Sequence, residues 1–198
     1  MPGVSIRRVC VFCGSQRGRH PRYVEATREL ALALCRRSWG VIYGGGQVGL
    51  MGTLADAVLE CGGEVIGVIP RSLATKELTH PRATQMHVVE NMHQRKALMA
   101  QLADAFIALP GGYGTLEELM EVITWAQLGI HHKPIGLLNL CGYYDPWLEM
   151  IHRGVEQGFI HPEYLKVFCI EKEPQGLLAA LESFASPQLP QWMRIEET

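Results

Sequence analysis

Short apolar segments, each bounded by glycine or proline and followed by a longer amphipathic stretch, constrain the fold of this chain most strongly. Residues 65–69 and 105–109, for example, carry no polar side chain. Strands that are apolar on both faces belong to a parallel sheet lying between two layers of helices. The alternation therefore predicts an α/β fold: a three-layer, doubly wound parallel sheet that is broadly Rossmann-like.

The same alternation places the individual elements. Strands are expected at residues 8–13, 40–43, 64–69, 85–89, 105–109, 134–140 and 166–170. Helices are expected at residues 21–38, 49–61, 91–102, 115–128, 145–156 and 174–184. The polar connection between Pro70 and Pro81 is long for such a fold, so we interpret it as an active-site loop.

Length and composition indicate one soluble domain. The 198 residues suffice for a single domain, expected over residues 1–185 with a peripheral tail over 186–198. A net charge of -2 disfavours a protein that coats nucleic acid. No apolar run approaches the roughly 18 residues of a membrane span, and the first residues lack a signal-peptide profile. We therefore expect a cytoplasmic protein with no membrane or nucleic-acid partner.

The cysteines are scattered through apolar segments, which predicts reduced core residues in an intracellular protein. They are Cys10, Cys13, Cys35, Cys61, Cys141 and Cys169. Cys10 and Cys13 form a C-x-x-C motif, but it lies within a predicted strand and no second pair completes a zinc site. The sequence therefore predicts no metal.

Two glycine turns each run from a predicted strand into a predicted helix, where backbone amides can approach an anion. The first glycine turn, residues 44–49, formally matches the dinucleotide fingerprint. The acidic residue that would bind the ribose is Glu64, however, at the start of a strand and thus at the wrong end. An NAD site is not supported, and close strand–helix packing is the alternative interpretation of these glycines.

The second glycine turn, residues 110–115, continues into Leu116, Glu117 and Glu118. Thr115 and Glu118 have the spacing of a capping box, in which Thr caps the helix and Glu bonds back to it. Spacing alone favours the capping box. A carboxylate one turn inside a helix that faces a phosphate is also well placed for catalysis on the attached group, so both interpretations stay open.

Two adjacent cations, Arg95 and Lys96, open the helix predicted after the fourth strand. Cations are usually found near the end of a helix, where the helix dipole favours them. An anionic ligand would explain their position, and a solvated surface is the alternative. The nearby His93, like His131 and His132, has no spacing that predicts a metal site.

Three ordered motifs together resemble the LOG (Lonely Guy) family, the cytokinin riboside 5'-monophosphate phosphoribohydrolases formerly labelled lysine decarboxylases. The motifs cover residues 44–52, 92–96 and 110–118, and the likeness extends over about residues 9–160. The resemblance implies hydrolysis of the N-glycosidic bond of an N6-substituted AMP, with AMP itself as a further candidate, giving free base and ribose 5-phosphate without a cofactor.

The resemblance also implies the site. Arg95 and Glu118 would be catalytic, with Glu118 stabilising positive charge on the ribose. The substrate-binding positions would be Glu77, Arg95, Lys96, Gly112, Tyr113, Gly114, Thr115, Leu116, Glu117, Glu118 and Thr124. A lysine decarboxylase is disfavoured, because that chemistry normally needs pyridoxal phosphate on a lysine. The alternative from another class is a non-catalytic nucleotide-binding or carrier protein.

The helix predicted from Thr115 further suggests a homodimer with shared active sites. Thr124 follows Glu118 by six residues, which is about 240° around a helix. Both are implied substrate contacts, so we expect Thr124 to serve the site of a two-fold partner. Leu116, Leu119, Met120 and Ile123 would form the core stripe, with Trp125 and Leu128 at the interface. A Thr124 hydroxyl bonded to its own helix is the alternative.

Overall fold

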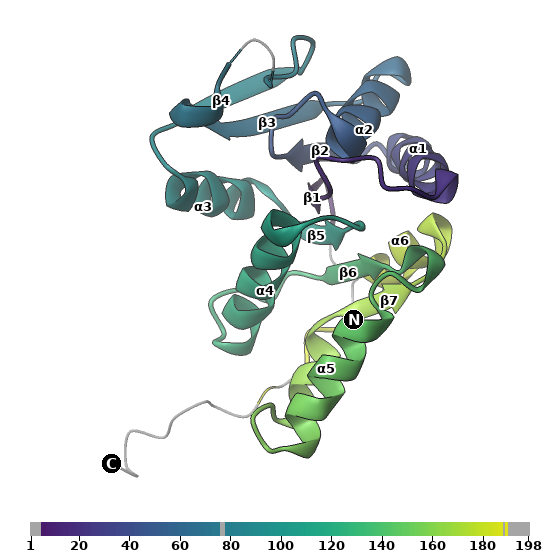
Figure 1. Ribbon diagram of the computed structural model, residues 1–198, viewed down its shortest axis with the longest axis vertical. Coiled ribbons are helices and arrows are strands. Elements are labelled where there is room, and N and C mark those ends of the chain that lie inside the picture. Colours follow the sequence, from purple (N-terminus) through teal and green to yellow (C-terminus); the bar gives the residue numbers. More distant parts are fainter. Residues whose placement is uncertain (1–4, 76–77, 188, 190–198) are drawn as a thin grey trace.

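The fold is built on one parallel sheet, seen in a computed structural model that describes residues 5–75, 78–187 and 189 (Figure 1). Within these residues the sheet has seven strands in the order β4-β3-β2-β1-β5-β6-β7, and every neighbouring pair is parallel. The strands are β1 (Arg8–Phe12), β2 (Gly40–Tyr43), β3 (Val65–Pro70), β4 (Gln85–Val89), β5 (Ala105–Ala108), β6 (Ile135–Leu138) and β7 (Cys169–Glu171).

Helices cover both faces of the sheet, as the two-sided apolar strands require. They are α1 (Pro21–Arg36), α2 (Gly49–Glu60), α3 (Met92–Leu102), α4 (Tyr113–Gln127), α5 (Asp145–Glu156) and α6 (Pro174–Glu182). Short 3₁₀ turns lie at Arg71–Leu73, Leu140–Gly142 and Pro162–Val167. The predicted three-layer α/β fold is confirmed.

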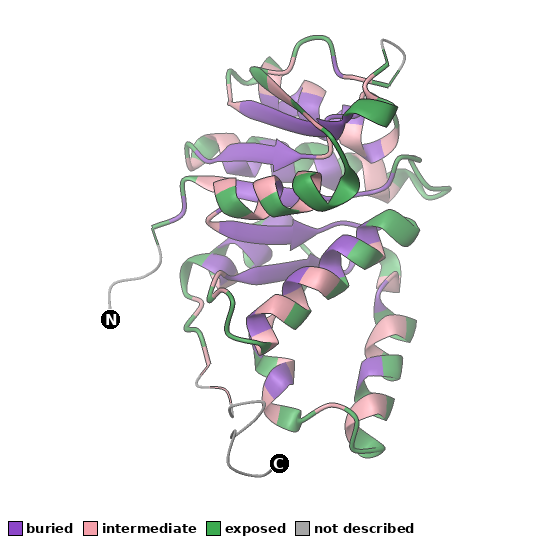
Figure 2. Ribbon diagram, turned by 90° about the vertical axis from the view of Figure 1, so that its left-hand side faces the viewer, coloured by how far each residue is buried: buried purple, intermediate pink, exposed green. Residues whose placement is uncertain are grey.

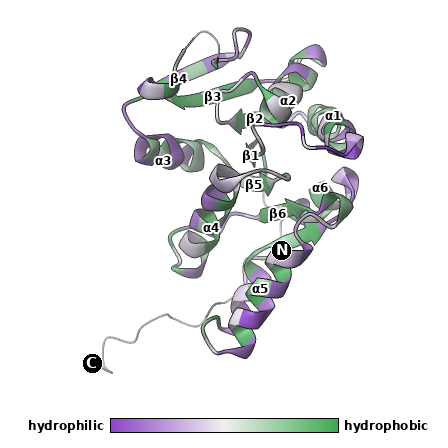
Figure 3. Cartoon of the chain, in the orientation of Figure 1, coloured by the Kyte–Doolittle hydropathy of each residue, from purple (hydrophilic) through white to green (hydrophobic). Residues whose placement is uncertain are grey.

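Successive strand residues point to opposite faces, and this divides the core in two. Leu30, Leu54 and Leu177 bring α1, α2 and α6 into one core. Met99 and Leu119 bring α3 and α4 into the other. The central strands are buried along their length (Figure 2), and their apolar character contrasts with the mixed helix surfaces (Figure 3).

The strand order places a ligand site. The chain builds outward from β1 to β4 on one side and then returns to β5 on the other side of β1. At such a switch point the connections after the two central strands diverge and leave a crevice beyond their carboxyl ends. The turn after β1 and the second glycine turn, which follows β5, therefore border the same crevice.

Some details differ from the sequence predictions. Residues 166 and 167 end a 3₁₀ turn that Pro162 begins, so β7 is shorter and starts later than expected. Cys35 and Cys61 form a disulfide between the ends of α1 and α2, so the expectation of six reduced cysteines is wrong for this pair. Cys141 is exposed rather than in the core.

The C-x-x-C motif does not form a paired site. Cys10 is buried in the core beneath α3 and α4, whereas Cys13 is buried in the core beneath α1 and α2. In the described part of the chain, no helix has both the length and the apolar character needed to cross a membrane. The division into a domain over residues 1–185 and a tail stays a prediction.

Candidate active site

The turns after β1, β2 and β5 are bonded to one another at the carboxyl edge of the sheet. The Gly14 amide donates to Pro110 O at 3.1 Å, and the Leu50 amide donates to Gly14 O at 3.0 Å. Gly49 has a φ of +62°, and a Cβ atom there would lie 2.2 Å from the carbonyl carbon of Ser15. At this position the packing interpretation of the first glycine turn is confirmed, because only glycine fits.

The capping-box interpretation of Thr115 and Glu118 is wrong. Helix α4 begins at Tyr113 with Gly112 as its N-cap, and no side chain caps it. Thr115 is therefore the third residue of the helix and Glu118 the sixth, too far along to bond back to the cap. Thr115 is buried instead and packs against Gly111, where a Cβ atom would lie 2.1 Å from the Thr115 hydroxyl oxygen.

The uncapped start of α4 offers donors to an anion. The first helical hydrogen bond runs from Leu116 N to Gly112 O at 3.1 Å. The amides of Tyr113, Gly114 and Thr115 precede that bond, at the positive end of the helix dipole. A Cβ atom at Gly112 or Gly114 would meet nothing within 4 Å, so the approach to these amides is open.

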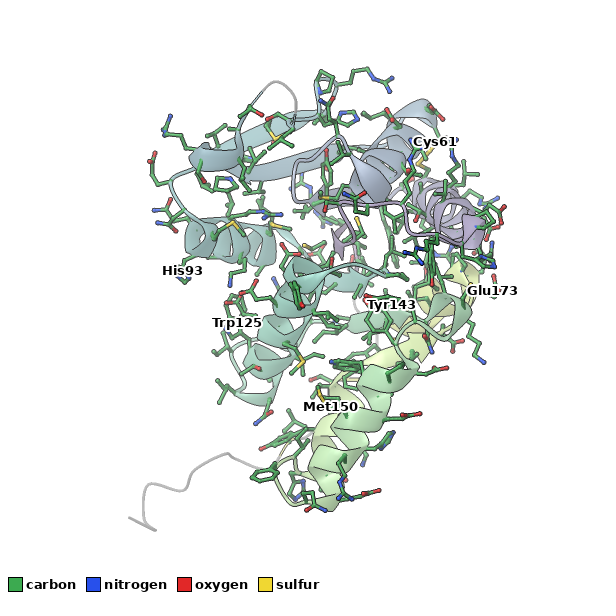
Figure 4. The ribbon with its side chains drawn as sticks, in the orientation of Figure 1. Cys61, His93, Trp125, Tyr143, Met150 and Glu173 are labelled. Atoms are coloured by element: carbon green, nitrogen blue, oxygen red, sulfur yellow. A yellow bond between two sulfur atoms is a disulfide. The ribbon has the colours of Figure 1, made fainter. Side chains whose placement is uncertain are left out.

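A cleft of about 270 Å³ adjoins this helix start. Its walls come from the turn after β1 (residues 14–18), residues 110–112 of the second glycine turn, and the side chains of Tyr23, Leu50 and Tyr143. Tyr143 extends from the segment after β6 (Figure 4), and its hydroxyl donates a hydrogen bond to Gly111 O. The cleft thus lies at the switch point that the topology predicts.

Arg95 of α3 and Glu118 of α4 form a buried ion pair. Arg95 Nη2 lies 3.3 Å from Glu118 Oε1, and the two side chains are only 12% and 8% exposed. Arg95 Nε also donates to Val68 O at 3.1 Å. A Cβ atom at Gly44 would lie 2.1 Å from Arg95 Nη2, so the first glycine turn provides the surface on which the guanidinium rests.

Burial controls the charge of Glu118. Withdrawal of the carboxyl group from water raises the pKa of Glu118 to about 7, and the Arg95 guanidinium offsets only part of this effect. Glu117 raises this pKa further, while Lys96 lowers it. A carboxyl group that titrates near neutral pH between two helices is typical of a catalytic position rather than of a surface ion pair.

Lys96 does not share the environment of Arg95. Its Nζ contacts Glu117 and lies 3.0 Å from Glu121 Oε1, so two carboxylates of α4 neutralise it. The alternative of a solvated cation is thereby excluded for Lys96, whose side chain is only 9% exposed. Neighbouring His93 is exposed on the outer side of α3 (Figure 4).

Thr124 is not brought together with Glu118 within one chain. Thr124 is exposed, and its hydroxyl donates to Met120 O at 2.7 Å, as the alternative interpretation expected. The predicted core stripe of α4 is wrong at Met120, which is exposed, while Leu119 is buried and Leu116 and Ile123 are half-buried. The buried positions of α4 are Thr115, Glu118, Leu119, Val122 and Ala126.

One predicted site residue lies outside the described residues, and two features around the site are not predicted from the sequence. Glu77 lies outside the described residues. The turn after β1 borders the cleft but was not predicted, although a Gly-Ser pair directly after a strand could have indicated it. His80, which bonds to the first glycine turn, carries no sequence signal that distinguishes it from other loop residues.

Known proteins resemble this chain over most of its length. The family model described as "Possible lysine decarboxylase" matches residues 51–181. The probable cytokinin riboside 5'-monophosphate phosphoribohydrolase LOGL2 of Oryza sativa is 53% identical over 92% of this chain and 74% of its own. The cytokinin riboside 5'-monophosphate phosphoribohydrolase LOG3 of Arabidopsis thaliana is 51% identical over 90% of this chain and 83% of its own.

A solved structure supports the fold. The molybdenum cofactor carrier protein of Chlamydomonas reinhardtii aligns with a TM-score of 0.68 at 19% identity, over 91% of this chain and 98% of that chain. At this identity the likeness concerns the fold alone. The identity to the plant enzymes and the family match show more: the chain belongs to the LOG family, the cytokinin riboside 5'-monophosphate phosphoribohydrolases.

Proposed function

We propose that this protein hydrolyses the N-glycosidic bond of N6-substituted adenosine 5'-monophosphates, and of AMP as a further substrate. The oxygen of water bonds to C1' of the ribose as the bond to the base breaks, a proton of that water passes to the base, and the products are the free base and ribose 5-phosphate. The buried Arg95–Glu118 pair beside an uncapped helix start is the observation that carries the proposal. Release of a free cytokinin base would make the protein a cytokinin-activating enzyme.

The reaction needs stabilised positive charge at C1'. As the bond to the base breaks, the ribose acquires oxocarbenium character, which a nearby carboxylate stabilises. Ionised Glu118 supplies that carboxylate, either electrostatically or by forming a transient bond to C1'. Arg95 donates charge-assisted hydrogen bonds to the substrate as the base departs with the bonding electrons. The hydrolysis so written uses no metal or organic cofactor.

The 5'-phosphate is proposed to bind at the start of α4. The amides of Tyr113, Gly114 and Thr115 donate to its oxygens, and the open surface at Gly112 allows close approach. Leu116 and Glu117 continue this turn, and Lys96 adds positive charge from α3 once its carboxylate partners rearrange. Glu77 is proposed to contact the substrate from the long loop.

We also propose a homodimer in which each site uses both chains. Tyr113, Leu128 and Ile130 are 94%, 48% and 65% exposed along α4 and its end, an apolar surface that a two-fold partner would cover. Thr124 lies on the same helix, and its oxygen can still accept a hydrogen bond while its proton bonds to Met120 O. A cytoplasmic location is proposed because nucleoside monophosphates are intracellular metabolites.

The proposed activity is tested by incubating the protein with AMP and with isopentenyladenosine monophosphate and measuring free base. Release of base from either substrate supports a hydrolase, and the ratio of rates shows which base is preferred. Binding of both nucleotides without release would instead support the alternative, a non-catalytic carrier. A carrier has no need for a buried carboxylate beside the ribose, which is why the hydrolase is favoured.

A further inference from the structure

A segment of the long loop is bonded to the first glycine turn. The backbone amide of His80 donates to Gly45 O at 2.9 Å. Gly46 and Thr79 form an isolated antiparallel bridge beside this bond. The loop after β3 is therefore paired through its backbone with the turn that follows β2, although the two segments are more than thirty residues apart in the chain.

Each ring nitrogen of His80 has a polar neighbour. Its Nδ1 accepts a hydrogen bond from the Arg82 amide at 3.3 Å, which places the ring proton on Nε2. Nε2 faces Asp56 Oδ1 of α2 at 3.4 Å, and the His80 side chain is only 3% exposed. His80 therefore links α2 through its ring and the glycine turn through its backbone.

The first glycine turn, together with Val68 O, limits where the Arg95 guanidinium can lie. Gly44 is in direct contact with Arg95 Nη2, the same atom that lies 3.3 Å from Glu118 Oε1. The other side of the turn is filled, since a Cβ atom at Gly45 would lie 3.1 Å from Met86 Sδ. A shift of the turn would therefore displace the guanidinium from Glu118.

We propose that His80 is a positioning residue for the glycosidic hydrolysis: by joining Asp56 to the first glycine turn, it keeps that turn against Arg95 and holds the guanidinium on Glu118. The inference rests on the proposed function for its kinetic effect. His80 itself takes no part in bond making or breaking. Asp56 is the second positioning residue, because the His80 ring faces its carboxylate.

Two substitutions separate the contacts of the ring. His80→Gln places an amide donor near the position of Nε2 and keeps the link to Asp56. His80→Asn places a carbonyl acceptor near the position of Nδ1 and keeps only the bond from the Arg82 amide. We expect kcat of the Asn variant to fall about tenfold to a hundredfold, the scale for a misplaced catalytic group, with KM changed less than kcat and most of the activity retained in the Gln variant.

Arg82→Gln is the matched control. The Arg82 guanidinium also contacts Asp56, but it is exposed and lies outside the link to the turn. We expect this variant to keep wild-type kcat. A loss as large as that of His80→Asn would overturn the proposal, because Asp56 would then act through Arg82 and the surface of the loop.

The pKa of Glu118 can be measured by titration, and a change in the overall stability of the protein does not by itself change it. Arg95 lowers the pKa of Glu118. If the guanidinium is displaced, this effect weakens and the pKa of Glu118 rises. Carbon-13 NMR of the Glu118 carboxyl should therefore show a higher pKa in His80→Asn than in wild type or His80→Gln. An unchanged Glu118 pKa in the folded Asn variant would overturn the proposal. The experiment needs no turnover, whereas failure of the proposed function would appear as wild-type protein that releases no base.

Discussion

Arg95 Nη2 lies 3.3 Å from Glu118 Oε1, and both side chains are largely shielded from water. Burial raises the pKa of Glu118 to about 7 even with the guanidinium beside it. The pair is therefore poised for a change of charge near neutral pH, which distinguishes it from the exposed ion pairs elsewhere on the surface.

Glu118→Gln tests the catalytic carboxylate. The amide keeps the shape of the side chain but cannot stabilise the ribosyl cation, so turnover should fall by at least about a hundredfold. The thermal midpoint at pH 8 should not decrease, because burial disfavours the charge that the substitution removes. Near-normal turnover in a folded variant would leave Glu118 with a structural role only.

The pH dependence of wild-type kcat/KM should follow the ionisation of Glu118. Because the ionised form is the active one, the rate should be low in acid, rise through about pH 7 and level off above it. The residual activity of Glu118→Gln should lack this rise. A wild-type rate that is constant between pH 5.5 and 8.5, measured with one saturable substrate, would contradict the assignment.

Arg95→Lys separates charge from geometry. Arg95 uses two nitrogens of one planar group: Nε donates to Val68 O, and Nη2 faces Glu118 Oε1. Lysine keeps the positive charge but cannot make both contacts in that geometry, so kcat should fall by about one to two orders of magnitude. Lys96→Arg serves as the comparison, since Lys96 contacts carboxylates as a point charge. Full activity of Arg95→Lys would show that a cation of any shape suffices.

Mixed dimers test whether Thr124 serves the neighbouring site. Glu118→Gln chains and Thr124→Val chains are combined in equal amounts, after confirming that each variant alone is impaired. If sites are shared, a random mixture should regain about a quarter of the wild-type activity, because half of the sites in half of the dimers are intact. Activity that never exceeds the sum of the two variants, or an active monomer in light scattering, would contradict shared sites.

Much of the fold was predictable because the strands are apolar on both faces and short. That pattern fails at residues 166–168, where Val167 is buried in a 3₁₀ turn and looks the same in sequence as a buried strand residue. Helix α4 begins two residues earlier than the sequence predicts, because Gly112 and Gly114 disfavour a helix and Thr115 with Glu118 imitates a capping box.

The site was predictable where chemistry leaves a local pattern and not where it depends on packing. Arg95 and Glu118 stand in recognisable motifs directly after strands. His80 and the Cys35–Cys61 disulfide depend on contacts between segments distant in sequence. Only the folded chain brings α1 to α2, or the long loop to the first glycine turn.

The start of α4 is proposed to bind the 5'-phosphate of a nucleotide whose glycosidic bond is then cleaved beside Glu118. The most direct measurement compares release of free base from isopentenyladenosine monophosphate and from isopentenyladenosine, at equal concentrations and at pH 8. The amides that precede Leu116 can hold the phosphate but gain nothing from the riboside, so cleavage of the monophosphate with hardly any cleavage of the riboside is predicted. Equal rates on the two compounds would contradict the account.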